Sequence, residues 1–190
     1  MRSALFVLCS LVVLSARAET WTHEADERGD IDLHVALDPT EQAGRATATI
    51  RIHASREVVW PLITTCPEAL KTVPGLVACT VLDAAPDGSW QRLRHVLDYS
   101  WFIPRLTYEI RATYDKPSRV FFERVSGDLK TLRVAWVLQS DGDDTIARYS
   151  VDLAPGFWVP HWLVRSALKR DLPKMLRAVR GEAESARMHR

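Results

Sequence analysis

The feature that most constrains the fold of this chain is a long amphipathic segment near its C-terminal end, residues 160–180. At about 100° per residue, its apolar side chains fall on one arc of a helix and most of its basic side chains on the other. Such a helix is not stable alone and needs a large apolar surface to pack against. The apolar arc contains Val164, Leu168, Leu172, Met175, Leu176 and Val179, and the basic side contains Arg165, Lys169, Arg170, Lys174, Arg177 and Arg180.

The preceding part of the chain can supply that surface as a sheet. Alternating apolar and polar residues, separated by turn residues, predict strands over 30–37, 46–53, 76–84, 90–99, 106–114, 120–125, 131–139 and 145–153. Two short helices are expected after the second of these strands, over 56–64 and from Pro67 to Val73. This order predicts an α+β fold in which a curved antiparallel sheet wraps around the long C-terminal helix.

The first eighteen residues have the pattern of a secretory signal peptide. Arg2 precedes an apolar run, and Ala16-Arg17-Ala18 is a small-x-small cleavage site. We therefore expect cleavage after Ala18 and a periplasmic or secreted protein; an uncleaved membrane anchor is the alternative. The remaining chain is expected to contain a leader with one extra strand (19–45), a single domain (46–184) and a disordered tail (185–190).

Charge and cysteine content narrow the classes of partner. Without residues 1–18 the chain has 23 Lys+Arg against 24 Asp+Glu, which argues against a nucleic-acid-binding protein. Two cysteines remain, Cys66 and Cys79, and an even pair in an exported protein favours a disulfide, with two buried thiols as the alternative. Their spacing does not match a zinc site, and we expect neither a metal ion nor a cofactor.

Several stretches resemble the START-like helix-grip superfamily, in particular its bacterial polyketide cyclase/dehydrase and coenzyme-Q-binding branch. They are the entry into the first short helix at Ile52 to Trp60, the bend at Pro74-Gly75, Gly127 with Trp136, and the closing stretch APGFWVPHWLVRSALKRDLPKMLRAVRGEAE. The resemblance covers roughly Ala46 to Glu184. It implies a helix-grip fold, and a function among lipid carriers, ligand sensors, cyclases and small-molecule binders.

Strand alternation predicts which side chains face the helix. These are mostly aliphatic and aromatic, with a few polar groups, as in an apolar ligand pocket. The predicted ligand-binding residues are Leu93, His95, Leu97, Tyr99, Tyr108, Ile110, Phe122, Trp136, Tyr149, Leu168 and Leu172.

His95 is the residue in this set whose chemistry suits acid-base catalysis. Tyr99 lies on the same predicted face, about 13 Å along the strand, which is too far for a direct pair. Asp98 has the opposite parity, so no His-Asp pair is expected. We therefore predict no catalytic residue, and interpret His95 as a polar group of the pocket wall.

Two connections are rich in aromatic residues and are expected to form the pocket entrance. The predicted entrance residues are Trp101, Phe102, Phe157, Trp158 and Trp162. Exposed tryptophan beside a basic helix face suits peripheral contact with an anionic membrane. The alternative is that these residues fold over the pocket as a dry lid.

The leading hypothesis is an exported binder or carrier of a hydrophobic small molecule, such as a lipid, a quinone or a polyketide-like compound. Two alternatives stay open. One is a cyclase- or dehydratase-type enzyme that uses His95 and a pocket tyrosine. The other is an envelope module that binds a partner protein through its apolar loops.

Overall fold

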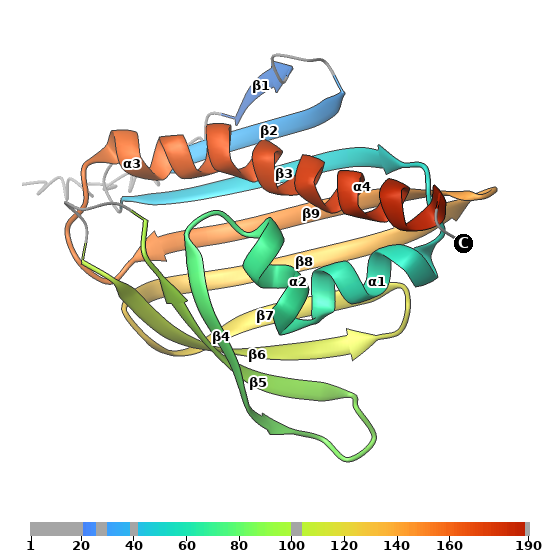
Figure 1. Cartoon of the computed structure of the whole chain (residues 1–190). Coiled ribbons are helices and arrows are strands. Elements are labelled where there is room, and N and C mark those ends of the chain that lie inside the picture. Colours follow the sequence, from blue (N-terminus) through green and yellow to red (C-terminus); the bar gives the residue numbers. More distant parts are fainter. Residues whose placement is uncertain (1–20, 26–29, 39–41, 100–103, 189–190) are drawn as a thin grey trace, which may run out of the picture.

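A computed structural model describes residues 21–25, 30–38, 42–99 and 104–188. It contains one antiparallel sheet with the order β1-β2-β3-β9-β8-β7-β6-β5-β4. The long C-terminal helix and two short helices lie on its concave side (Figure 1). The strands are β1 (Trp21–Ala25), β2 (Ile31–Asp38), β3 (Ala43–Ile52), β4 (Leu76–Ala84), β5 (Trp90–Leu97), β6 (Leu106–Asp115), β7 (Arg119–Gly127), β8 (Leu129–Asp141) and β9 (Asp144–Pro155).

Three stretches of helix complete the fold. α1 (Arg56–Thr64) and α2 (Cys66–Thr72) follow β3, and α3 (His161–Ser166) continues through a π-helical turn, η1 (Ala167–Asp171), into α4 (Leu172–Met188). None of the helices in the described part of the chain is long and apolar enough to cross a membrane. The curved antiparallel sheet around a long C-terminal helix is the helix-grip arrangement expected from the sequence.

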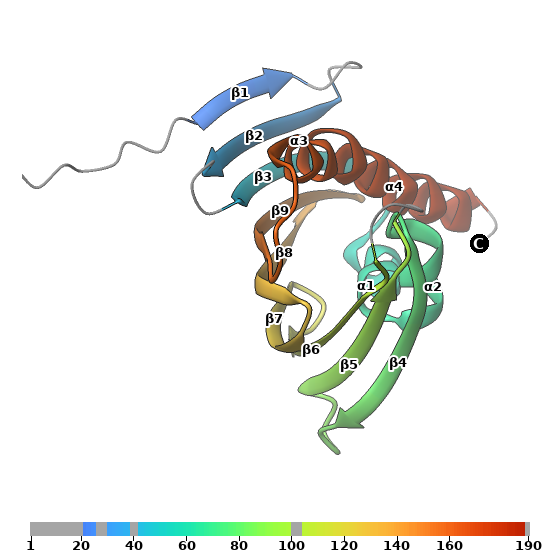
Figure 2. The same ribbon diagram turned by 90° about the vertical axis from the view of Figure 1, so that its left-hand side faces the viewer.

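The sheet is strongly curved, and the helices lie on its concave side (Figure 2). One cause lies where β6 meets β7, because the pairing shifts between Glu109 and Ile110. Gly127 pairs with Tyr108 there at a φ of +101°, and a Cβ at this position would lie 2.3 Å from the carbonyl oxygen of Thr107. Only glycine fits this backbone geometry, which lets the strands bend around the helix.

The solid part of the core lies between α4, α1 and the β2-β3-β9-β8 side of the sheet. Leu176 and Val179 of α4 are 0 % and 1 % exposed, and they belong to the same buried cluster as Val59, Ile50 and Ile52. Each fully buried aliphatic side chain contributes about 1.5–3 kcal/mol through removal from water. This half of the molecule is therefore closed by close packing.

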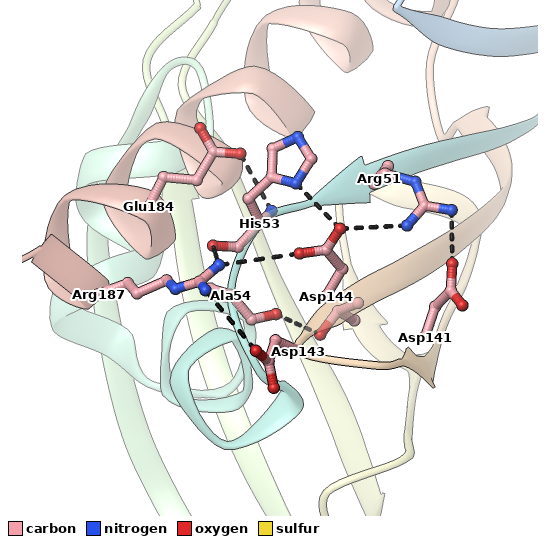
Figure 3. A network of polar contacts seen from close by, with 9 residues as sticks. Arg51, His53, Ala54, Asp141, Asp143, Asp144, Glu184 and Arg187 are labelled. Carbon is pink, nitrogen blue, oxygen red and sulfur yellow. Dashed lines mark hydrogen bonds and ion pairs between the residues drawn. The ribbon is translucent and has the colours of Figure 1, made fainter.

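Polar contacts fix the C-terminal end of α4 to two loops (Figure 3). Arg187 donates a hydrogen bond of 3.0 Å to the carbonyl oxygen of His53, and the backbone N–H of His53 donates one of 3.1 Å to Glu184. The buried hydroxyl of Thr145 donates to the carbonyl oxygen of Ala54 at 2.7 Å. The end of the helix is thus joined to the β3–α1 turn and to the start of β9.

Charged residues of the β8–β9 hairpin extend this network. Asp144 accepts hydrogen bonds from Arg51 at 3.2 Å and lies 3.0 Å from the imidazole of His53, while Asp141 accepts one from Arg51 at 2.5 Å. Burial acts to raise the pKa of Asp144, but the hydrogen bonds and positive charges of His53 and Arg51 together lower it below its ordinary value. The hairpin is therefore held against β3 by ionised groups at neutral pH.

Several expectations about the two ends of the chain were wrong. The leader was expected to contain one strand, but β1 also forms within it and pairs with β2 from Trp21 to Ala25. Residues 185–188, expected in a disordered tail, form the end of α4. Residues 1–18, the predicted signal peptide, lie outside the described residues, so its cleavage stays a prediction.

The long helix is also less regular than its periodicity suggests. Pro173 has no N–H to donate and its ring crowds the carbonyl oxygen four residues earlier. In the turn just before it, the backbone N–H of Leu172 donates to Ala167, five residues back. The helix is therefore irregular just before Pro173, where it forms a π-helical turn.

Candidate functional site

A two-lobed apolar cavity lies between the helices and the β4–β9 part of the sheet. The inner lobe has a volume of about 160 Å³ and the outer lobe about 220 Å³. They adjoin, because both are bordered by Val73, Tyr108, Leu132, Tyr149 and Met175. Only together do the two lobes reach the lower end of the range for small-molecule sites, about 300–1,000 Å³.

The inner lobe is bounded by α1, α2 and the middle of the sheet. Cys66, the first residue of α2, forms a disulfide with Cys79 of β4, and both border this lobe. Their Cα atoms are 5.3 Å apart, within the range of ordinary disulfides. The predicted bond is thus confirmed, and it fixes α2 against the edge strand as one wall of the cavity.

Every predicted ligand-binding residue borders one of the two lobes. The inner lobe is bordered by Leu93, His95, Tyr108, Ile110, Phe122, Trp136 and Tyr149, and the outer lobe by Leu97, Tyr99, Tyr108, Tyr149, Leu168 and Leu172. Strand alternation was therefore sufficient to find the concave face. That these residues bind a ligand stays a prediction.

His95 is paired with a residue of the neighbouring strand. Its Nδ1 lies 3.3 Å from the hydroxyl oxygen of Tyr108, which is its register partner on β6, and the two rings meet edge to face. Burial lowers the pKa of His95 to about 4, so the ring is neutral at pH 7. Burial also raises the pKa of Tyr108 and of Tyr149.

Three buried polar atoms at the cavity have no hydrogen-bond partner among the described residues. Nε2 of His95 is at the inner lobe, and the hydroxyl oxygen of Tyr99 and Oδ2 of Asp171 are at the outer lobe. Buried polar groups in folded proteins are nearly always paired. Their concentration at one cavity indicates that a bound molecule or water completes them.

Asp171 was not among the predicted site residues, although the sequence contains a signal for it. At 100° per residue, position 171 falls about 20° beyond Val164, at the edge of the apolar arc. It is also the only acidic residue between His161 and Gly181. A charged residue on the inward side of an amphipathic helix is unusual and was the sign to look for.

Only one carboxylate oxygen of Asp171 has a hydrogen-bond partner among the described residues. Its Oδ1 accepts a hydrogen bond of 3.0 Å from Nε of Arg170, an exposed side chain, and its own side chain is 12 % exposed. Burial raises the pKa of this carboxyl, and the positive charge of Lys174 partly opposes that effect. The outer lobe thus contains an acidic group within a mostly apolar lining.

The predicted entrance residues do not all have the same environment. Phe157 borders the outer lobe and is 36 % exposed, whereas Trp158 and Trp162 are 75 % and 56 % exposed and border neither lobe. Trp101 and Phe102 lie outside the described residues. Trp158, before α3, and Trp162, within α3, are therefore exposed, whereas Phe157 contributes to the wall of the outer lobe; the dry lid stays an alternative.

No group of three or more His, Cys, Asp or Glu residues suited to a metal ion occurs in the part of the chain that the structure describes. The acidic side chains drawn in Figure 3 instead form hydrogen bonds and ion pairs with arginine and histidine residues. Within those residues, the cavity is the feature most suited to a ligand.

Comparison with solved structures supports the same fold. A STAR-related lipid transfer protein from Xanthomonas axonopodis is 19% identical, with a TM-score of 0.71, over 86% of this chain and 98% of the other. The lipid transfer and protein localization domain of human StarD13 gives 0.70 at 13% identity, over 87% and 89% of the two chains. The Zhui aromatase/cyclase from a Streptomyces species gives 0.63 at 17% identity, over 75% and 94%.

These identities are low enough that the likeness shows the fold alone. No curated protein sequence matches this chain at a significant level. A family model does match it, over residues 52–180, which include α1, the cavity-bearing strands and most of the C-terminal helix. The chain therefore belongs to the family described as polyketide cyclase / dehydrase and lipid transport.

Proposed function

We propose that this protein is an exported binder or carrier of a hydrophobic small molecule, such as a lipid, a quinone or a polyketide-like compound. The observation that supports this most strongly is the two-lobed cavity, whose lining is mostly aliphatic and aromatic. An apolar cavity with a few convergent polar groups is the usual form of a small-molecule site. The unpaired atoms of His95, Tyr99 and Asp171 are those polar groups.

The disulfide supports the proposed export, because such bonds persist mainly in oxidising compartments. The signal-like pattern of residues 1–18 points in the same direction. N-terminal sequencing of protein recovered from the cell envelope or the medium should begin at Glu19. A sequence that begins at Met1 would contradict export by cleavage.

Blocking the cavity tests the binding function. Leu132 borders both lobes, whereas its neighbour Arg133 is exposed on the opposite face of β8. We expect wild-type protein to take up Nile red, an apolar fluorophore, with an increase in emission. Leu132→Trp should weaken uptake at least tenfold, because the indole fills the space where the lobes meet.

Arg133→Trp is the matched control, since it adds the same side chain outside the cavity and should leave uptake unchanged. Circular dichroism and thermal unfolding establish that both variants fold. Equal uptake by wild type and by folded Leu132→Trp would exclude the cavity as the binding site. Native mass spectrometry of protein from its own envelope would then identify the natural ligand or a bound partner protein.

The His95–Tyr108 hydrogen bond is the observation that favours the second candidate, a cyclase- or dehydratase-type enzyme. Two properties argue against it as the leading function. A histidine with a pKa of about 4 is a weak base at neutral pH. In addition, no carboxylate among the described residues hydrogen-bonds to its ring. His95→Gln should therefore alter ligand affinity modestly; loss of a turnover with binding intact would establish the enzyme.

Peripheral contact with a membrane is part of the same proposal. Trp158 and Trp162 are exposed beside the outer lobe, and the basic residues of the following helix lie close to them in sequence. Amphipathic indole rings favour the membrane interface and basic residues favour anionic lipid. Trp158→Ser should reduce co-sedimentation with vesicles of phosphatidylglycerol and phosphatidylcholine; unchanged co-sedimentation would place the contact elsewhere.

A further inference from the structure

The carboxylate of Asp171 is the least explained group in the cavity. It lies at the outer lobe, its side chain is 12 % exposed, and its Oδ2 has no hydrogen-bond partner among the described residues. Burying an unpaired charged oxygen is costly, and folding gains little from it. The neighbouring side chains of the helix at this lobe are Ala167, Leu168, Leu172 and Met175, none of which can donate a hydrogen bond.

The local backbone explains why this side chain faces inward. Asp171 is the last residue of the π-helical turn that precedes Leu172 and Pro173. A π-helical turn inserts an extra residue into the helix, and such turns are frequent at functional sites. Here Asp171 borders the lobe together with Ala167 and Met175, each four residues away along the chain.

The contact with Arg170 does not account for the carboxylate. Arg170 reaches only Oδ1, from a side chain that is 71 % exposed, and exposed ion pairs contribute little to stability. Arg170 does place a positive charge beside the carboxylate. Neutralising the charge of Asp171 therefore does not require a second cation. Oδ2 still needs a donor, because an ionised carboxylate can only accept hydrogen bonds.

A second unpaired group borders the same lobe. Tyr99 follows β5, and its buried hydroxyl has no hydrogen-bond partner within the described ranges. A phenol can both donate and accept a hydrogen bond. A ligand hydroxyl suits both residues chemically, because a hydroxyl can donate to a carboxylate such as that of Asp171 and accept from a phenol such as that of Tyr99.

We propose that the outer lobe is a subsite for the hydroxyl group of an otherwise apolar ligand, with Asp171 as acceptor and Tyr99 as donor. This inference rests on the proposed function and narrows its ligand class to hydrophobic alcohols. The apolar part of the ligand extends along the shared residues Tyr149 and Leu132 into the inner lobe.

Matched ligands test the subsite through competition with bound Nile red. The probes are decan-1-ol, its methyl ether and decylamine, which have similar chains but differ in their polar group. We expect decan-1-ol to bind wild type roughly tenfold more tightly than the ether, which corresponds to a net hydrogen bond of about 1.4 kcal/mol. The ether is the more hydrophobic of the two, so partitioning alone would give the opposite order.

Variants assign the effect to these residues. Asp171→Leu should reduce the alcohol-to-ether ratio to about one while the ether binds at least as well as before. Tyr99→Phe should reduce the ratio several-fold. Asp152→Leu is the matched control, because Asp152 pairs with Arg45 on the outer face of the sheet and does not border either lobe; it should leave the ratio unchanged. Thermal unfolding verifies each fold, and Asp171→Leu should not lower Tm.

The outcomes separate this inference from the proposed function. If alcohol and ether displace Nile red equally from wild type, the cavity binds apolar molecules but the hydroxyl subsite is refuted. If decylamine binds most tightly, the subsite recognises a cation and the assignment to alcohols is overturned. If folded wild type binds neither Nile red nor any probe, the proposed function itself fails.

Discussion

The two ends of the C-terminal helix serve different purposes. Around Leu176 and Ala183 the helix packs against β3 and α1, and farther along Glu184 and Arg187 bind the turn after β3. Around Leu168 and Asp171 the same helix borders the outer lobe, and Oδ2 of Asp171 has no hydrogen-bond partner among the described residues. Close packing stabilises one end of the helix, whereas the other end is packed less closely because it borders a cavity.

The comparison shows how a single helix can be both a core element and a binding surface. Its apolar periodicity is continuous, but Leu176 and Ala183 face a solid cluster, whereas Met175 borders both lobes and Val179 borders the inner one. The residues that stabilise the fold and those that border the cavity are therefore neighbours in sequence. Substitutions a few residues apart should have very different effects.

The largest expected contrast is between Leu176 and Leu172. Leu176 is 0 % exposed and borders neither lobe, so Leu176→Ala leaves a new void and should cost about 3 kcal/mol of unfolding free energy. Leu172 is 5 % exposed but already borders the outer lobe. Leu172→Ala should cost about half as much. Denaturant unfolding measures both, and equal losses would remove the distinction between the two ends.

Between about pH 4 and 6.5, acid sensitivity should arise at His95 of the cavity. Burial lowers the pKa of folded His95 from 6.5 to about 4, so between these pH values the unfolded chain binds more protons than the folded one. Stability should therefore be complete above about pH 6.5 and fall by up to about 3 kcal/mol as the pH approaches 4.

His95→Gln should remove this part of the pH dependence. His53→Gln is the control, because His53 belongs to the network at the anchored end, where its side chain is 62 % exposed. Urea unfolding at several pH values between 4 and 7 gives both profiles. The same slope in His95→Gln as in wild type would show that other groups cause the acid sensitivity.

The smallest effect is expected at Arg187. Its side chain is 50 % exposed, so Arg187→Gln should cost only about 0.5–1 kcal/mol through loss of the bond to His53. Nile red affinity should not change, because the residue is remote from both lobes. A clear change in affinity would mean that the anchored end controls the cavity, and the two ends would then not be independent. Arg165→Gln, on the exposed face of α3, is the control for loss of a helix charge.

The fold was predictable because periodicity records which face of each element is buried. Strand alternation identified Leu93, Tyr108 and Trp136 as inward-facing, and the helical arc identified Leu168 and Leu172. The strand at Trp21–Ala25 was missed, since its sequence WTHEA has little alternation and its position depends on pairing with β2. Edge strands of this kind are determined by their neighbours more than by their own pattern.

The site was predictable in outline but not in its polar detail. His95 was recognised and Tyr99 was judged too far along the strand to pair with it, but the register that places Tyr108 directly across from His95 was not predicted. Hairpin register depends on bulges and turn geometry that the sequence does not specify. Asp171 was not predicted because the helical arc was defined by its apolar residues alone, and the one acidic residue at its edge was not included.

Gly44 has a consequence for the shape of the cavity. It lies on β3 beneath the helix, and a Cβ there would come within 2.4 Å of a methyl group of Leu168. Leu168 borders the outer lobe, so an added carbon would displace its side chain and change the shape of that lobe. Gly44 itself borders neither lobe. The shape of the cavity thus depends on a backbone position that is not part of its wall.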